Sequence, residues 1–371
     1  MLKRRILFLS AEADVKGGGE RFLWDVIGGL SEDFEIACVS PAEGVLADRL
    51  RGLGVKVAIC PTGWNLKWRN WVANRVRAAR LAREVRSFRP QVIYANGGHT
   101  NNLAVRLGKH LRCPVVANVH DVFSRVRKDK YAFGRADVAV ACSAGVAAQV
   151  RPFNSGVRVV YNGVDTKVYS SLQRGAARTS LGLKEGQFAV GFVGTLVAKK
   201  GIAEFIETAR IIAQEVPEAV FVVVGAPKSG DEAVLAQLQV LVERYHLQKH
   251  FHWLGFVEGL DRLLPALDVL LFPAHYEAFG RVIIEAMACG VVPVSSPAAG
   301  PKEIIEEGVT GFLRPYEDTK ALASAVCCLY RDTALRASMV AAGRKAVLER
   351  YSMASMLAGV KQAVVDAMKG S

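Results

Sequence analysis

The chain has 371 residues, of which 51% are hydrophobic, and a formal net charge of +13. This length favours two domains, and the apolar fraction is sufficient for a large core. No uncharged apolar run reaches the roughly 18 residues of a membrane-spanning helix, and the apolar stretch 6–9 is too short for a signal peptide, so we expect a cytoplasmic protein.

The excess positive charge lies in the first half of the chain. Residues 1–170 contain 27 Lys and Arg against 14 Asp and Glu, whereas residues 171–371 contain 21 of each. A charge concentrated in one half predicts a surface that faces an anionic partner.

Apolar runs in the first half predict β-strands. They are continuously apolar rather than alternating, which is typical of parallel strands covered on both faces. Helical segments lie between most of them, as in the βαβ units of a doubly wound sheet. The predicted strands are residues 5–10, 36–40, 55–60, 92–96, 114–120, 138–143 and 157–162.

The segment 64–90 is strongly basic, with eight Lys and Arg and one Glu. Its tryptophans recur at i, i+4 and i+7, which places them on one face of a helix. Indole rings in a basic surround are typical of a helix in a membrane interface. A solvated arginine face with tryptophans packed on the sheet, or a surface for an anionic acceptor, are the alternatives. The candidate surface residues are Trp64, Trp68, Trp71, Arg75, Arg77 and Arg80.

A polar segment with Gly and Ser, residues 171–186, predicts a linker, after which the strand pattern restarts. The predicted domains are therefore residues 1–170 and 187–351, and we expect the helical segment 352–371 to rejoin the first domain. The second half is predicted to have strands at 188–194, 219–225, 251–256, 268–273 and 291–296, and helices at 202–215, 232–246 and 281–289.

Two carboxylates, Glu277 and Glu285, lie in the loop and helix that follow the predicted strand 268–273, with Gly280 at the junction. A helix N-terminus at the carboxyl end of a strand offers N–H groups and a partial positive charge to a phosphate. The helix is apolar nearly all round, so Glu285 should need a partner. We therefore expect these carboxylates to bind the hydroxyl groups of a sugar and a ribose; a solvated loop residue and a helix-surface charge are the alternatives.

Gly17–Gly19 follow the first predicted strand and precede a helix. Their N–H groups can cradle a diphosphate, although a plain tight turn would look the same. The pattern is neither G-x-G-x-x-G nor a Walker A loop, which disfavours a nicotinamide cofactor or ATP. His120 ends an apolar strand, where a hydrogen-bonded structural histidine is as well supported as a functional one.

The E-x7-E spacing, the following AMACGVVPV run, Gly300 and the segment EGVTGFL resemble the donor site of retaining glycosyltransferases of family 4, which have the GT-B fold. The resemblance implies two Rossmann-like, doubly wound α/β domains that face each other across a cleft. It implies sugar transfer from a UDP- or GDP-linked donor to a glycan or lipid-linked hydroxyl, as in the synthesis of cell-envelope polysaccharides or glycolipids. Further motifs of the family are resembled at residues 17–30, 118–121, 136–150, 159–169 and 191–201.

The resemblance also implies roles for single residues. His120 would lie under the transferred sugar, Glu277 would act beside it and Lys200 would neutralise the donor phosphates. Thr195 stands where the family often has an arginine, so one positive charge is missing. Either Lys199, Arg281 or another basic residue compensates, or the donor differs. The implied donor-binding residues are Gly18, Gly19, Thr195, Gly225, Phe256, Phe279, Gly280 and Glu285.

The sequence contains no Asp-x-Asp pair, and no His, Cys and Asp residues have the spacing of metal ligands. We therefore expect no metal ion and no cofactor besides the donor. The seven irregularly spaced cysteines indicate free thiols. A nucleotide-sugar epimerase of the same fold, a two-carboxylate glycosidase and a non-enzymatic polyanion-binding protein are the alternative functions. The basic half has no recognisable nucleic-acid-binding motif, so we expect no nucleic-acid partner. The protein is expected in the cytoplasm, or bound peripherally to the inner membrane face.

Overall fold

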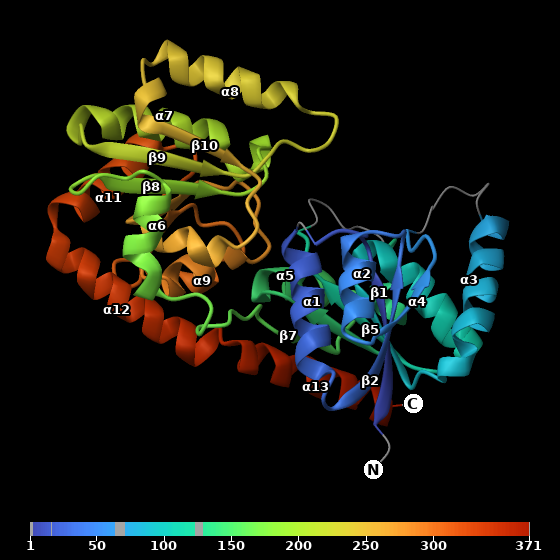
Figure 1. Ribbon diagram of the computed structural model, residues 1–371. Helices are drawn as coiled ribbons and strands as arrows, with labels where there is room; N and C mark the ends of the chain where they lie inside the picture. The colour runs from blue at the N-terminus through green and yellow to red at the C-terminus, as the bar shows by residue number, and fades with distance from the viewer. Residues whose placement is uncertain (1–2, 16, 64–70, 123–128, 371) are drawn as a thin grey trace. The chain divides into compact units, whose positions relative to one another are not determined.

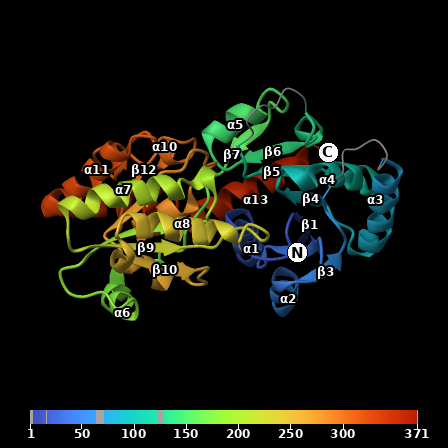
Figure 2. The same cartoon turned by 90° about the horizontal axis from the view of Figure 1, so that it is seen from above.

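The computed structural model describes residues 3–15, 17–63, 71–122 and 129–370. Within these residues the chain forms two compact units, each built on its own parallel sheet (Figures 1 and 2). The first unit contains Met1–Asn162 and Ala354–Ser371, and the second contains Gly163–Met353. Two Rossmann-like α/β domains were predicted from the sequence, and this fold class is confirmed.

The first unit has a parallel sheet with the strand order β3-β2-β1-β4-β5-β6-β7. The direction in which successive strands are added reverses between β1 and β4, as in a Rossmann fold. Each strand predicted in this half is present, with ends that differ by a few residues. The strands are β1 (Arg4–Ser10), β2 (Phe34–Ser40), β3 (Lys56–Ile59), β4 (Val92–Asn96), β5 (Val115–Val119), β6 (Val138–Ala141) and β7 (Val157–Val159).

Helices cover both faces of this sheet. Helices α3 and α4 lie side by side, whereas α1 packs against α13 so closely that a methyl group added at Gly29 would overlap Leu357. Two ion pairs also hold α13, from Lys361 to Asp33 at 2.6 Å and from Arg158 to Asp366 at 2.6 Å. The helices are α1 (Gly18–Leu30), α2 (Val45–Gly52), α3 (Trp71–Val85), α4 (Gly98–Leu111), α5 (Ala144–Val150) and α13 (Met353–Lys369).

The second unit repeats this plan with the parallel strand order β10-β9-β8-β11-β12-β13. The strand order now reverses between β8 and β11. The prediction is right for five strands and missed β13, whose two residues are too few to give an apolar run. The strands are β8 (Phe188–Val193), β9 (Ala219–Val224), β10 (Phe251–Gly255), β11 (Val269–Phe272), β12 (Val292–Ser295) and β13 (Phe312–Leu313).

Helices α7, α8 and α11 pack over one face of the second sheet, and α9 and α12 pack over the other (Figure 1). The core beneath α7 is rich in phenylalanine, with the rings of Phe205 and Phe192 centred 5.5 Å apart. These helices are α7 (Ile202–Glu215), α8 (Ala233–Arg244), α9 (Arg281–Ala288), α10 (Pro301–Ile304), α11 (Thr319–Arg331) and α12 (Thr333–Arg350).

The segment 171–186, which the sequence predicts as a linker, contains a 3-10 turn, η4 (Ser171–Gln173), and a helix, α6 (Arg174–Ser180). It belongs to the second unit, and the chain passes between the units before it, after Asn162. The polar composition of the segment did not indicate that it packs on the second unit. The arginines of α6 make this packing possible, because they donate hydrogen bonds to backbone carbonyl groups of that unit.

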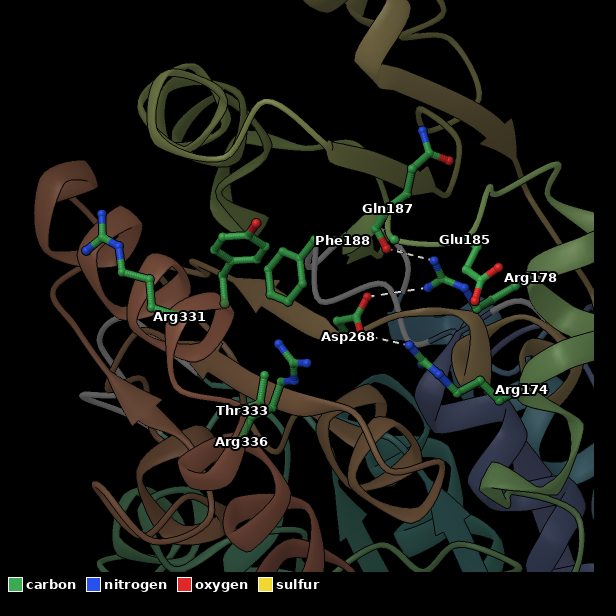
Figure 3. A pocket seen from close by; sticks show the side chains of 11 residues that line it. Arg174, Arg178, Glu185, Gln187, Phe188, Asp268, Arg331, Thr333 and Arg336 are labelled. Atoms are coloured by element: carbon green, nitrogen blue, oxygen red, sulfur yellow. Dashed lines mark hydrogen bonds and ion pairs between the residues drawn. The ribbon is translucent and has the colours of Figure 1, made fainter.

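Asp268, just before β11, is the residue that anchors α6. Its carboxylate accepts hydrogen bonds from Arg174 Nη2 at 2.7 Å, Arg178 Nη1 at 3.4 Å and the N–H group of Ala189 at 2.9 Å. Figure 3 shows the two guanidinium groups converging on this carboxylate. The same side chains line a cavity of about 590 Å³ at the amino ends of β8 and β11.

The substitution Asp268→Asn should destabilise the second unit by about 2–3 kcal/mol, because two partly buried guanidinium groups lose their counter-charge. Urea unfolding followed by circular dichroism would measure the change. The control is Glu349→Gln, which breaks an exposed pair with Lys345 on α12 and should change stability by less than about 0.5 kcal/mol. Equal effects of the two substitutions would contradict the anchoring role.

Candidate functional site

The candidate donor site of the second unit lies beyond the carboxyl ends of its strands, where the strand order reverses. Thr195 follows β8, Gly225 follows β9, Phe256 follows β10, and residues 277–280 follow β11. The loops are in close contact, since a methyl group added at Gly225 would overlap the carbonyl oxygen of Gly194. The structure therefore brings these predicted residues to one edge of the sheet. Ligands of open α/β sheets bind at such an edge.

The loop after β11 is fixed to the start of α7. The Lys199 carbonyl accepts hydrogen bonds from the N–H groups of His275 at 3.0 Å and Tyr276 at 3.4 Å. Gly201, with φ +76°, lets the chain pass Pro273, because a methyl group there would overlap the Pro273 carbonyl oxygen. Lys199 therefore supports the loop through its backbone, while its side chain is exposed.

Lys200 and Glu277, both predicted as catalytic, form a hydrogen-bonded ion pair. The second Glu277 oxygen accepts a hydrogen bond from the N–H group of Phe279 at 3.3 Å. The ammonium group also lies 5.4 Å from the centre of the Phe272 ring. The pair fixes both side chains at the carboxyl edge of the sheet, and the Lys200 charge is shared with Glu277.

Glu285 is 3% exposed on α9, and its Oε1 atom accepts a hydrogen bond from Arg281 Nε at 2.8 Å. The sequence correctly indicates that this carboxylate needs a partner, but it did not identify Arg281, although the i, i+4 spacing is the signal for such a pair. Because Arg281 already compensates the buried charge, the burial of Glu285 does not by itself require a ligand.

The N-terminus of α9 is shaped by glycines. Gly280, at the N-cap, has φ +91°, a conformation that favours glycine. Gly300 lies so close to the backbone of Phe279 that it leaves no room for a side chain, and its N–H group donates to the Glu277 carbonyl at 3.1 Å. The Phe279 ring is buried near Tyr351, so this residue faces the site through its backbone.

His275, Glu204 and Tyr316 form a cluster that the sequence did not reveal, and His275 lies two residues before Glu277. His275 Nε2 is 3.0 Å from Glu204 Oε1 on α7, and the centre of its ring is 3.6 Å from that of Tyr316. The three residues are far apart in sequence and follow no motif, so only the fold brings them together. The cluster adds a second side-chain link between the loop and α7.

In the first unit, His120 follows β5 and is held by two asparagines. Its Nε2 atom lies 2.7 Å from Asn118 Nδ2 and 2.9 Å from Asn96 Oδ1, and the amide of Asn96 donates to the Gly19 carbonyl at 2.9 Å. Asn96 and Asn118 are register partners at the ends of β4 and β5. The structure therefore places the candidates His120 and Gly19 side by side and adds two amides that the sequence analysis missed.

The N-terminus of α1 already holds a carboxylate. Glu20 accepts hydrogen bonds from its own N–H group and that of Gly17, an arrangement like a capping box. Burial, followed by repulsion from Glu12 and Asp121, raises the pKa of the Glu20 carboxyl group. This electronegative loop at Gly18 and Gly19 suits the hydroxyl groups of an acceptor or sugar better than a diphosphate.

The predicted basic surface is only partly described. Trp64 and Trp68 lie outside the described residues, and Trp71 is the first residue of α3. Arg75 and Arg80 are exposed on α3. The same helix carries Val72 and Val76, and each of these two valines is 62% exposed. Arg77 instead points inward: its guanidinium group donates to the carbonyls of Pro61 at 3.0 Å and Gly63 at 2.8 Å.

Across the described residues, no group of three His, Cys, Asp or Glu side chains is arranged to hold a metal ion. In the same residues, no helix combines the length and the apolar character needed to cross a membrane.

Two family models match the chain. The model described as "Glycosyl transferases group 1" matches residues 173–346, and the model described as "Glycosyltransferase Family 4" matches residues 16–168. These two regions include the candidate residues of both units.

Several curated proteins are similar to parts of the chain. It is 26% identical over 220 residues to N-acetyl-alpha-D-glucosaminyl L-malate synthase of Bacillus anthracis, covering 59% of this chain and 56% of that protein. It is 30% identical over 245 residues to alpha-maltose-1-phosphate synthase of Mycolicibacterium smegmatis, covering 61% of this chain and 62% of that protein. It is 29% identical over 170 residues to the capsular polysaccharide biosynthesis glycosyltransferase CapM of Staphylococcus aureus, covering 46% and 44%. The chain thus spans about half of the length of the curated relatives it matches.

Solved structures share the fold over almost the whole chain. Anabaena Alr3699/HepE in complex with UDP and glucose has a TM-score of 0.85 at 23% identity, covering 97% of this chain and 99% of that one. A glycosyltransferase from Rickettsia africae has a TM-score of 0.87 at 18% identity and covers 100% of both chains. These similarities confirm the predicted GT-B fold.

The substitution Gly201→Ala should disturb the candidate site, because the added methyl group meets the Pro273 carbonyl and displaces the loop that carries Glu277. We expect a loss of more than about 1 kcal/mol in stability, measured by urea unfolding. The matched control is Gly308→Ala, which has φ +75° but nothing within 4 Å of the added atom and therefore reports the backbone strain alone. If both variants lose the same stability, the contact with Pro273 does not matter.

Proposed function

The chain belongs to the group 1, family 4 glycosyltransferases, and from this premise we propose that it transfers a sugar from a nucleotide-diphosphate sugar to a hydroxyl group of a glycan or lipid-linked acceptor. The observation that carries the proposal is the pairing of Lys200 with Glu277 at the N-terminus of α9, where the strand order of the second unit reverses. A cation, a carboxylate and a helix N-terminus at this edge match the diphosphate and the sugar of such a donor.

In this proposal the donor diphosphate lies at the N-terminus of α9, close to Gly280 and Lys200. Glu277 accepts a hydrogen bond from the transferred sugar. Glu285 binds the ribose through Oε2, since Arg281 holds Oε1. The base lies near Gly225 and Phe256, whose ring is 49% exposed. UDP and UDP-glucose are bound in structures of the fold neighbour Alr3699/HepE, which supports a nucleotide sugar, with UDP or GDP as the nucleotide.

The proposed reaction retains the configuration of the anomeric carbon. The bond from this carbon to the diphosphate oxygen breaks, and the acceptor oxygen forms its bond on the same face. The acceptor proton passes to the departing phosphate. Lys200 and the N–H groups of α9 stabilise the charge that develops on the diphosphate, so the proposed transfer needs no metal ion.

The proposed acceptor site is in the first unit, around His120. The asparagines fix the imidazole ring, and the carboxylates near Gly19 favour an uncharged hydroxyl group. The exposed valines and arginines of α3 favour contact with an anionic membrane surface, which would supply a lipid-linked acceptor.

A thermal-shift titration with UDP, GDP, ADP and dTDP tests the donor site. One nucleotide should raise the melting temperature of the wild type, and Lys200→Met should weaken its binding about tenfold or more through loss of a charge-assisted contact. Lys199→Met, which removes the neighbouring exposed lysine charge, should bind as the wild type does. No shift with any nucleotide would contradict the proposal.

Sugar release from the matching donor should then require an acceptor, whereas turnover to an epimer without acceptor would indicate an epimerase.

Glu285 and Arg281 should together recognise the ribose. We expect the wild type to bind the nucleoside diphosphate at least about tenfold more tightly than its 2′-deoxy form, measured by calorimetry. This ratio should fall towards one in Glu285→Gln and in Arg281→Met, and should fall no further in the double variant. A ratio unchanged in Arg281→Met, with lower affinity for both ligands, would show that Arg281 does not orient Glu285.

A further inference from the structure

A groove of about 430 Å³ lies in the first unit at the amino ends of β1, β4 and β5, which are neighbours in the sheet. Its volume falls within the range of small-molecule sites. Pro90 and Pro114 form part of its wall, next to the starts of β4 and β5. Three cationic side chains from separate segments also line it: Arg4, Arg112 and Lys369.

These three cations have no counter-charge in the described part of the chain: none makes an ion pair there, and no carboxylate lines the groove. Burial, with a smaller effect of Asp137, raises the pKa of the neighbouring Cys113 thiol to about 12, so the thiol is neutral. Asp137 itself accepts a hydrogen bond from the Val115 N–H group. Like charges that converge without a counter-charge repel one another, and an anion would remove this cost.

The cavity at the corresponding edge of the second unit shows the contrast. It is lined by four arginines, but Asp268 pairs with Arg174 and Arg178 (Figure 3). Glu215 pairs with Arg331. Three of the four arginines of that cavity therefore have a carboxylate partner, whereas none of the three cations of the first unit's groove has one among the described residues.

The backbone at Arg112 is a second, independent observation. Arg112 caps the C-terminus of α4 with φ 54° and ψ 49°, a left-handed conformation that glycine or asparagine adopts with less strain. Arg89, directly before Pro90, has φ 51°. The residue that retains this conformation at the end of α4 is one whose side chain lines the groove.

We propose that this groove binds a phosphate group, held by the guanidinium groups of Arg4 and Arg112 and the ammonium group of Lys369. Guanidinium groups bind phosphate oxygens in a bidentate manner, and three cations match the charge of a phosphate monoester or diphosphate. Pro114 and His120 flank β5 and lie six residues apart, which corresponds to roughly 20 Å along the strand. The bound phosphate is therefore not the reacting donor but part of an effector or of a lipid headgroup.

The C-terminal ends of α4 and α13 also attract cations, which accounts for Arg112 and Lys369 individually. It does not account for Arg4, which begins a strand. The two explanations differ in a measurable way, because an interaction with the helix ends stabilises the protein whether or not phosphate is present.

The test uses the full chain and the melting temperature as a function of inorganic phosphate, with sodium chloride added to keep the ionic strength constant. The wild type should melt about 2–4 °C higher at a phosphate concentration about five times Kd. The double variant Arg4→Gln/Arg112→Asn should lose this response. Its folding is not at risk from the backbone, because asparagine suits the left-handed conformation at position 112.

A control tests for an unspecific effect of charge. Lys167→Gln removes an exposed charge from the second unit and should keep the phosphate response. A response that persists in the double variant would overturn the proposal.

Sedimentation with vesicles of phosphatidylcholine, with and without phosphatidylglycerol, distinguishes the sources of the phosphate. If inorganic phosphate has no effect but the wild type sediments with the anionic vesicles and the double variant does so at least about tenfold less tightly, the ligand is a lipid headgroup. If neither phosphate nor anionic vesicles distinguish the double variant from the wild type, the groove binds no phosphate group.

Discussion

Both units depend on one constraint: a parallel sheet must be covered by helices on both faces, and its crossovers are right-handed. Strands added in opposite directions from β1 and from β8 therefore place their connecting helices on opposite faces of the sheet. Where the order reverses, the loops that follow the two neighbouring strands lead to opposite faces. In the second unit the order reverses between β8, which leads to Gly194, and β11, which leads to the loop before α9. The helix that follows this loop has its N-terminus at the same point. The place proposed for the donor diphosphate is thus one that the topology favours before any side chain is considered.

Charge pairing then decides what each edge of a sheet can bind. In the second unit three buried or half-buried carboxylates have cationic partners: Lys200 for Glu277, Arg281 for Glu285, and two arginines for Asp268. Two of these pairs lie at the carboxyl edge, where a ligand can compete for one partner. The pair between Lys200 and Glu277 orients both side chains without a ligand, so little reorganisation would be needed for the proposed donor to bind.

Much of the fold could be predicted from the sequence because buried parallel strands are continuous apolar runs, and such runs mark every strand except the two-residue β13. The site was less predictable. Loop residues such as Glu277 and Lys200 carry a family pattern, but their pairing depends on how the loop after β11 meets α7. The asparagines that hold His120 come from two neighbouring strands, and their meeting depends on register. Arg281 was recognisable from its spacing to Glu285, whereas Glu204 and His275 gave no local signal.

The two edges of a parallel α/β sheet attract anions for different reasons. At the carboxyl edge helix N-termini supply the positive potential, so few cations are required, and Thr195 can replace an arginine if Lys200 and α9 provide enough charge. At the amino edge helix C-termini present carbonyl groups, which repel anions and attract cations. Only side chains can make that edge bind an anion, and they must outnumber the local carboxylates. None of the three cations that line the groove of the first unit has an ion-pair partner among the described residues, whereas three of the four arginines at the cavity around Asp268 are paired with carboxylates.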